Sequence, residues 1–220
     1  MLEKLPEAIG HALEHQRAGI EKILFNADRG ILETAQIEVT SPVFAPDSQL
    51  PQRFTADGAG ESPPLRWRNV PAEAATLALI VEDADSPTPE PLVHAIVVDI
   101  DPREIGLVEG IYNGPAKASP EKLGRNSYLS VGWLPPDPPP GHGVHRYAFQ
   151  VFALAAGAPL SKSPGRGELA TAIRERALGR GCLIGTYQRE VPIKTIEASE
   201  TELAQESLVT MPLETARTAI

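Results

Sequence analysis

Three polar clusters, each next to an apolar segment, hold the side chains with which this sequence could do chemistry. Asp83 and Asp85 directly follow one apolar segment. Because they are two residues apart, an extended chain would point both carboxylates to the same side. His94 opens a second apolar segment, and the third cluster, 141–147, reads Gly-His-Gly-Val-His-Arg-Tyr. Histidines beside carboxylates can bind an anion, exchange protons or hold a metal ion.

Short strands separated by turns are expected to position these clusters. Apolar residues alternate at period two, as in half-buried strands, in segments 37–39, 77–81, 93–97 and 147–151. Of the 22 prolines, 19 lie between Pro42 and Pro164, and proline disrupts a helix interior. Helical spacing appears in the same region only around 168–178. The sequence therefore predicts a mainly β protein, an antiparallel β-sandwich with one or two peripheral helices.

Composition and charge exclude several classes of protein. The net charge of −9 argues against nucleic acid as a partner, because phosphate backbones require a basic surface. The single cysteine, Cys182, rules out an internal disulfide and a cysteine-rich metal site. No apolar run is long enough to span a membrane, and the N-terminus lacks the pattern of a secretory signal. We therefore expect a cytoplasmic protein without an integral membrane segment.

Two extensions flank the strand-rich domain, residues 36–191. Residues 1–35 carry an apolar stripe at helical spacing, made of Leu5, Ile9, Leu13, Ile20 and Leu24. Such an amphipathic helix has to be covered, and we expect it to dock on a second copy as a homodimer. The alternative is that it covers its own sandwich. Residues 192–220 form an acidic C-terminal extension, in which Ser199 and Glu202 have the spacing of a capping box.

The order of the motifs resembles the phosphatidylethanolamine-binding protein family, also called Raf kinase inhibitor protein-like. Asp83–Pro87 is similar to the family's Asp-Pro-Asp-Ala-Pro, and Pro138–Tyr147, which ends in Gly-Val-His-Arg-Tyr, resembles its Gly-x-x-His-Arg-Tyr. Ser62–Trp67 resembles its Ser-Pro-x-Leu-x-Trp. The resemblance, to the bacterial or archaeal branch, covers residues 36–190 and implies a sandwich with a pocket at one end. The ligand-binding residues that it implies are Asp83, Asp85, Pro87, His94, Trp133, His145, Tyr147 and Tyr187.

The resemblance implies a binding protein without a cofactor or a metal. Family members bind phospholipid head groups, small anions, or kinases and proteases, and the sequence does not choose among these partners. A zwitterionic phospho-head group would match both the histidines and the carboxylates of the pocket. The alternative is a hydrolase that uses the Asp/His pocket, with or without a divalent metal. We expect no enzyme, because the spacing imposes no metal geometry and no Gly-x-Ser-x-Gly motif occurs.

Overall fold

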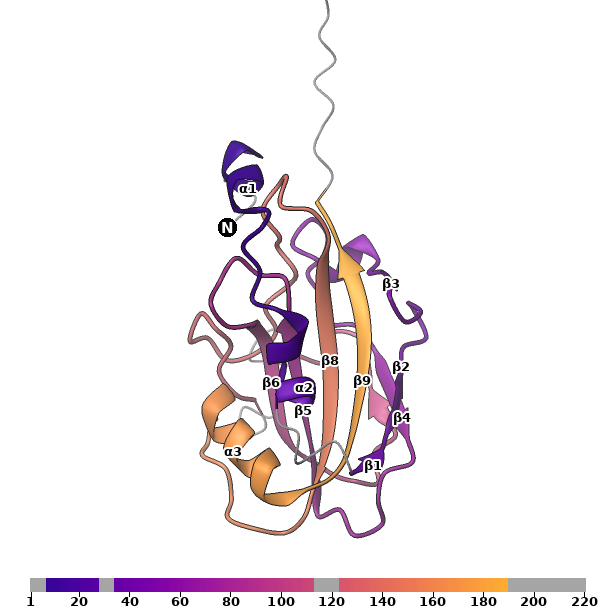
Figure 1. The fold of residues 1–220 in the computed structure, drawn as a ribbon. Coiled ribbons are helices and arrows are strands. Elements are labelled where there is room, and N and C mark those ends of the chain that lie inside the picture. Colours follow the sequence, from indigo (N-terminus) through magenta and orange to yellow (C-terminus); the bar gives the residue numbers. More distant parts are fainter. Residues whose placement is uncertain (1–6, 28–33, 113–122, 190–220) are drawn as a thin grey trace, which may run out of the picture. The chain divides into compact units, whose positions relative to one another are not determined.

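Two β-sheets, as predicted, make up the body of the protein (Figure 1). The computed structural model describes residues 7–27, 34–112 and 123–189. The larger sheet has the order β1-β9-β8-β5-β6, with β3 also paired to β9. Its strands are β1 (Ala35–Gln36), β3 (Ser48–Gln49), β5 (Thr76–Asp83), β6 (Leu92–Ile100), β8 (His145–Leu154) and β9 (Ala177–Tyr187). The smaller sheet, in the order β2-β4-β7, contains β2 (Glu38–Thr40), β4 (Leu65–Arg68) and β7 (Gly106–Leu107).

The long central strands are buried on both faces. Successive side chains along each strand point to opposite faces, so the strands contribute to two separate parts of the core. Leu79 and Val81 of β5 point to the smaller sheet and pack in a cluster with Trp67 of β4. The alternate residue Ile80 points to the opposite face, where it packs with Ile173 of α3 (Arg166–Arg176). A helix was expected at 168–178, and α3 instead ends at Arg176 because β9 begins at the next residue. A short 3-10 helix, η4, spans Gln52–Phe54.

The N-terminal extension is not the single helix that its apolar stripe predicted. It forms α1 (Glu7–Leu13), the 3-10 helix η2 (Ile20–Lys22) and α2 (Leu24–Ala27). The chain leaves the helical path after Leu13, and Gly19 has a φ of 109°, a conformation that favours glycine. Leu5 of the predicted stripe lies outside the described residues. We call residues 13–27 the N-terminal strap.

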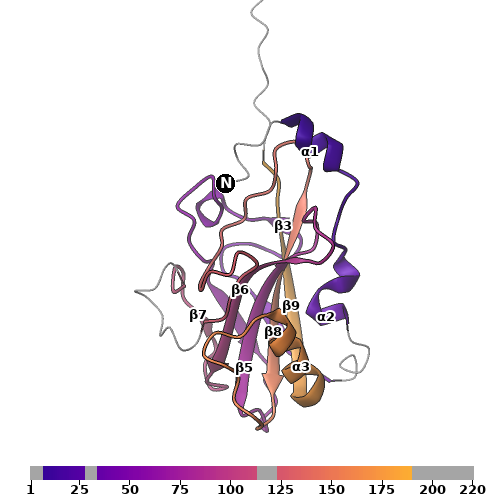
Figure 2. The same ribbon diagram turned by 90° about the vertical axis from the view of Figure 1, so that its left-hand side faces the viewer.

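The N-terminal strap packs against the sheet of its own chain. Leu24 is buried among residues of β5, β6, β8 and α3, and α2 lies on the same side of the sheet as α3 (Figure 2). Ile23 is buried against Ala84 and Ala148. Of the described apolar residues that suggested a homodimer, Leu24 is buried within its own chain, Leu13 and Ile20 are half-buried, and Ile9 is 40% exposed. The strap therefore covers part of its own sheet, as in the alternative to the dimer, and the homodimer stays a prediction from the sequence.

A buried polar network also fastens the strap to the sheet. Glu82 of β5 is fully buried, and its Oε2 accepts hydrogen bonds from the Leu24 N–H (2.8 Å) and from Gln150 Nε2 (2.8 Å). Gln150 Oε1 accepts from the Phe25 N–H at 2.7 Å. These are N–H groups of the first turn of α2, which a helix leaves unpaired. Arg166 of α3 completes the network, donating from Nε to Glu82 Oε1 (2.6 Å) and from Nη2 to the Lys22 carbonyl (2.6 Å).

The predicted C-terminal extension, with its capping box, lies outside the described residues. Within the described ranges, no helix is long and apolar enough to cross a membrane.

Candidate ligand-binding site

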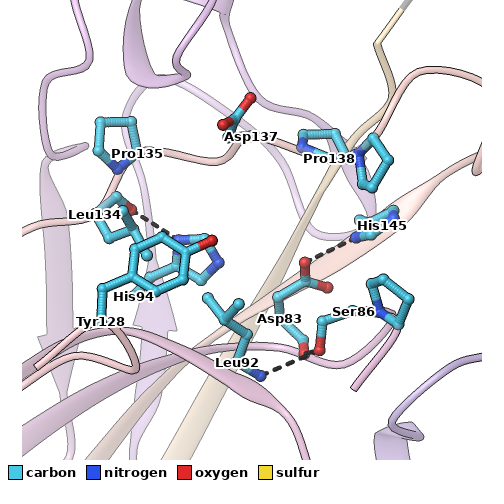
Figure 3. Close-up of a pocket in the computed structure, with 12 residues that line it drawn as sticks. Asp83, Ser86, Leu92, His94, Tyr128, Leu134, Pro135, Asp137, Pro138 and His145 are labelled. Carbon is cyan, nitrogen blue, oxygen red and sulfur yellow. Dashed lines mark hydrogen bonds and ion pairs between the residues drawn. The ribbon is translucent and has the colours of Figure 1, made fainter. Parts of the chain in front are cut away.

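A small cavity, partly open to solvent, lies where β5 ends and β6 and β8 begin. Because β5 pairs with both neighbours, Asp83 at its end is placed opposite Leu92 of β6 and Tyr147 of β8. In Figure 3, Tyr128 and His94 lie on one side of the cavity, and Asp83 and His145 lie on the other. The polar lining residues are Asp83, Ser86, His94, Asp137 and His145; the apolar walls and rim come from Pro87, Leu92, Tyr128, Leu134, Pro135, Pro138 and Pro139.

His94 presents an unused hydrogen-bonding atom at this cavity. Its side chain is buried, and its Nδ1 lies 2.7 Å from the carbonyl oxygen of Leu134. A carbonyl can only accept, so Nδ1 carries the proton and donates. Burial lowers the pKa of His94, despite the nearby Asp83 carboxylate, so the ring is neutral and Nε2 carries a lone pair. Nε2 is itself buried and has no partner among the described residues.

Asp83, His145 and His142 form one continuous chain of hydrogen bonds. His145 Nδ1 lies 2.7 Å from Asp83 Oδ2, and His145 Nε2 lies 2.6 Å from His142 Nδ1. At the far end, His142 Nε2 faces the carbonyl oxygens of Leu13 (2.8 Å) and Gln16 (3.2 Å) in the strap. Both histidines are 1% exposed. A path of buried polar groups therefore joins the N-terminal strap to the wall of the cavity.

The partners in this chain determine where its protons sit. His142 Nε2 faces only carbonyl oxygens, so it must carry a proton. Burial and the neighbouring His145 lower the pKa of His142, which keeps the ring neutral and leaves Nδ1 as an acceptor. His145 Nε2 must then be the donor in the contact between the two rings. One further proton lies between His145 Nδ1 and Asp83, so the Asp83–His145 pair carries no net charge whichever of the two atoms holds it.

Asp85 is turned away from the cavity, contrary to the expectation from its spacing. The chain turns after Asp83, whose Oδ1 accepts a hydrogen bond from the Asp85 N–H at 2.9 Å. The Asp85 carboxylate instead binds Arg146 through two contacts of 2.7 Å and lies 3.1 Å from Arg17 Nη1. Burial acts to raise the pKa of Asp85, but the hydrogen bonds and charge of Arg146 outweigh it and hold that pKa below its usual range. Asp85 therefore fixes two loops and does not line the cavity.

The sequence of this chain matches the family described as phosphatidylethanolamine-binding protein over residues 40–188. The chain belongs to the phosphatidylethanolamine-binding protein family. An archaeal relative, a UPF0098 protein from Methanothermobacter thermautotrophicus, is 35% identical over 146 residues, which cover 66% of this chain and 95% of the relative. A Mycobacterium tuberculosis relative, 34% identical over 152 residues (69% of this chain and 72% of the relative), bears the lipoprotein name LppC.

A solved structure supports the same family fold. The phosphatidylethanolamine-binding protein homologue CT736 from Chlamydia trachomatis superposes with a TM-score of 0.63 at 30% identity. The match covers 71% of this chain and all of CT736. Neither the family nor these relatives carry the name of an enzymatic activity. The N-terminal strap lies before the residues that match the family.

Of the residues that the family resemblance implied, the structure brings four to the cavity wall: Asp83, Pro87, His94 and His145. Three aromatic residues lie behind or beside it. Tyr147 is fully buried, with its ring centre 5.2 Å from that of His94, and burial raises its pKa well above the ordinary value. Trp133 packs between His94 and Phe149, with ring centres 6.2 and 6.4 Å away. Tyr187 donates its hydroxyl to Asp57 at 2.7 Å.

Sequence reasoning missed several residues of the site. Asp137 and Tyr128 line the cavity, and His142 extends the Asp83–His145 pair. The proline-rich loop around Asp137 offered a signal, since a carboxylate between prolines has few local partners. Arg189, two residues after β9, binds both Asp137 and Asp57 at 2.8 Å. Among the described residues, no group of three or more His, Cys, Asp or Glu side chains is arranged to hold a metal ion.

Proposed function

We propose that this chain is a binding protein whose cavity takes a small acid or a phospho-head group carrying at least one O–H or N–H donor. The observation that carries this proposal is the unpartnered Nε2 of His94 at the cavity. A buried acceptor without a partner has lost its hydrogen bonds to water. A ligand that donates to it recovers the free energy of a hydrogen bond. Dihydrogen phosphate, a protonated carboxylic acid and an ammonium group can all donate in this way.

The charges around the cavity favour such a ligand over a bare dianion. The Asp83–His145 pair has no net charge, and the His94 ring is neutral. Nearby, the two carboxylates of Asp57 and Asp137 share the single guanidinium of Arg189. A phosphate dianion would find no uncompensated cation in this set, whereas a monoanion brings less negative charge and a zwitterion brings its own ammonium. Phosphoethanolamine, which combines both features, is the head group that fits this reasoning best.

The walls of the cavity suit the carbon part of a ligand. Four of the lining residues are prolines, which have no N–H to donate and hold a fixed φ: Pro87, Pro135, Pro138 and Pro139. Leu92 and Leu134 add further apolar surface. Preformed, mostly apolar cavities with a few polar groups are the usual form of small-molecule sites. The specificity therefore rests on the polar residues between these walls.

Binding is favoured over hydrolysis because the histidines lack the properties of a general base. Both ring nitrogens of His145 are engaged, one with Asp83 and the other with His142. His94 has a free Nε2, but its lowered pKa makes it a weak proton acceptor. Regulation of a kinase or protease and a cytoplasmic location stay predictions from the sequence.

Isothermal titration calorimetry with phosphate, phosphoethanolamine and acetate tests this proposal. We expect binding by the wild-type chain, tightest for phosphoethanolamine, and an affinity loss of about tenfold in His94→Leu, since a ligand hydrogen bond contributes about 1 kcal/mol or more. The matched control is His15→Leu, because the His15 side chain is 94% exposed. The proposal is wrong if none of the three ligands binds the wild type, or if His94→Leu binds as tightly as the wild type.

A further inference from the structure

The N-terminal strap contacts both loops that build the cavity. On the loop after β5, the Ala18 N–H donates to the Ser86 carbonyl (2.9 Å) and the Gly19 N–H donates to the Ala84 carbonyl (2.8 Å). Ser86 is itself a lining residue. Lys22 Nζ adds a hydrogen bond of 2.8 Å to the carbonyl of Pro89. The backbone of the strap thus follows the outer side of one cavity loop.

Arg17 connects the strap to the second loop, which precedes β8. Its guanidinium donates to the carbonyl oxygens of Val144 (2.8 Å) and His142 (3.0 Å). The same guanidinium lies 3.1 Å from the buried carboxylate of Asp85 on the first loop. One strap residue therefore holds the two loops together.

Gly10 of α1 approaches the same second loop closely. It is buried, and a Cβ at this position would collide with the carbonyl oxygen of Pro140. Only glycine can make this backbone contact without a shift of either segment. Gly10 itself does not line the cavity, so a substitution there would disturb the docking of α1 and the adjacent strap without changing a cavity side chain.

His142 connects the strap to the cavity through hydrogen bonds. Its Nε2 proton is required because the carbonyls of Leu13 and Gln16 face that atom. This proton leaves Nδ1 as the acceptor for His145 Nε2. If the strap moved away, the tautomer of His142 would no longer be fixed, and His145 would lose the acceptor for its Nε2 proton.

We propose that the N-terminal strap sets the ligand affinity of the cavity through His142, a positioning residue that holds the proton on His145 Nε2. The proposal rests on the proposed function, since it concerns the affinity of that same cavity. While His142 accepts this proton, the Asp83–His145 pair has no net charge. Without an acceptor the buried proton is lost, and the pair becomes one charge more negative beside the ligand. An acidic ligand is then repelled.

The charged and titratable groups around the two histidines come from several elements. Asp83 of β5 pairs with His145, and His94 of β6 lies across the cavity. Arg17 of the strap touches the backbone of His142. Asp137 of the proline-rich loop acts on His94 through its charge. Of these groups, only Arg17 belongs to the strap.

The test compares four variants of the full chain. His142→Leu removes the acceptor. His142→Gln keeps it, because an amide oxygen can accept from His145 while the amide NH₂ donates to the strap carbonyls. Gly10→Ala displaces α1 from the loop at Pro140. Its matched control is Gly167→Ala, an exposed position in α3 where an added Cβ meets nothing within 4 Å.

Two measurements are made on each variant. Calorimetry with phosphoethanolamine should show affinity about three- to tenfold weaker in His142→Leu and in Gly10→Ala, the worth of about one hydrogen bond. Affinity should stay near that of the wild type in His142→Gln and Gly167→Ala. In the unliganded protein, nitrogen-15 NMR should detect the His145 Nε2–H and its coupling to His142 Nδ1 across the hydrogen bond. This coupling should be weakened in Gly10→Ala and unchanged in Gly167→Ala.

Failure of this inference is distinguishable from failure of the proposed function. Wild-type binding with unchanged affinity in His142→Leu or Gly10→Ala overturns the inference and leaves the binding function standing. Equal losses in His142→Gln and His142→Leu also overturn it, because the hydrogen-bond pattern would then not matter. If the wild type binds none of the ligands, the binding function fails, and the NMR coupling in Gly10→Ala and Gly167→Ala still decides whether the strap controls the His145 proton.

Discussion

His142 Nδ1 lies 2.6 Å from His145 Nε2, in a contact that is buried from solvent. Because His145 uses its other nitrogen for Asp83, the ring is held at both ends and offers no free N–H to a ligand. The hydrogen-bonding capacity at the cavity therefore shifts to His94, whose Nε2 is unpartnered. This division of roles distinguishes a ring that sets the local charge from a ring that contacts the ligand.

Affinity for acetate and for phosphate should increase as the pH falls from 7.5 to 6. The lowered pKa of His94 means that the empty site carries no proton on Nε2 near neutral pH. An acid that binds at Nε2 must therefore keep its own proton or take one up from solution. Uptake of one proton on binding changes the affinity by up to about tenfold per pH unit. Calorimetry in two buffers of different ionisation enthalpy measures this uptake. Affinity that is independent of pH, or that increases with pH, would contradict the role given to His94.

The stability of the unliganded protein should also fall in acid, in two steps. His94 and His142 have lowered pKa values, so the unfolded chain binds more protons than the folded chain once the pH drops below about 6.5. Stability is therefore fully present above pH 6.5 and declines below it, by at most about 1.4 kcal/mol per pH unit for each histidine. A second decline begins near pH 4. The pKa values of Asp57 and Asp85 are lowered in the folded chain, so below this pH the unfolded chain binds more protons than the folded chain.

Urea denaturation between pH 3 and 8 measures both steps. His94→Leu should reduce the upper step and leave the lower step in place, because it removes one of the two histidines with a lowered pKa. His15→Leu is again the control, since His15 is exposed. An upper step of the same size in His94→Leu would show that the acid sensitivity arises elsewhere.

The part of the site that could be predicted from sequence follows from the motif order together with the family resemblance. Asp83 ends one strand, and His94 and His145 lie near the start of the strands on either side. Antiparallel pairing of neighbouring strands brings such positions to the same sheet end, and the resemblance supplied the expectation that these three strands are neighbours. Asp85 failed this reasoning because the chain turns directly after Asp83, and alternation applies only within a strand.

The buried polar contacts could not be predicted from local sequence patterns, because their partners lie far apart in the sequence. Glu82 looks like one more acidic residue in a solvated cluster, yet it is buried, and its partner Arg166 lies 84 residues away. His142 sits between two glycines and resembles a loop residue, although it reaches carbonyl oxygens more than 120 residues earlier in the chain. The apolar stripe of the N-terminal extension was real, but the break after Leu13 directs its two halves to different surroundings.

Loss of the buried carboxylate at Glu82 should destabilise the protein strongly. In Glu82→Leu the guanidinium of Arg166 and the Leu24 N–H lose their acceptor. Because Arg166 remains partly exposed, we expect about 2–4 kcal/mol of lost unfolding free energy, at or somewhat below the usual range for a broken buried pair. The double variant Glu82→Leu/Arg166→Leu should recover part of this loss. Urea denaturation measures both, with Glu38→Gln in the exposed Glu38–Arg68 pair as a control that should change little.

Truncation of Leu24 should lower stability without changing the mass of the particle in solution. Its side chain is 6% exposed and packs on the sheet of its own chain, so Leu24→Ala leaves a cavity worth about 2–5 kcal/mol. The matched control is Ile9→Ala in α1, because Ile9 is 40% exposed and should lose much less. Sedimentation of the wild type and both variants checks the mass, and urea denaturation checks the stability. A change in mass caused by Leu24→Ala, with little loss of stability per chain, would instead place Leu24 in an interface between two copies and support the homodimer expected from the sequence.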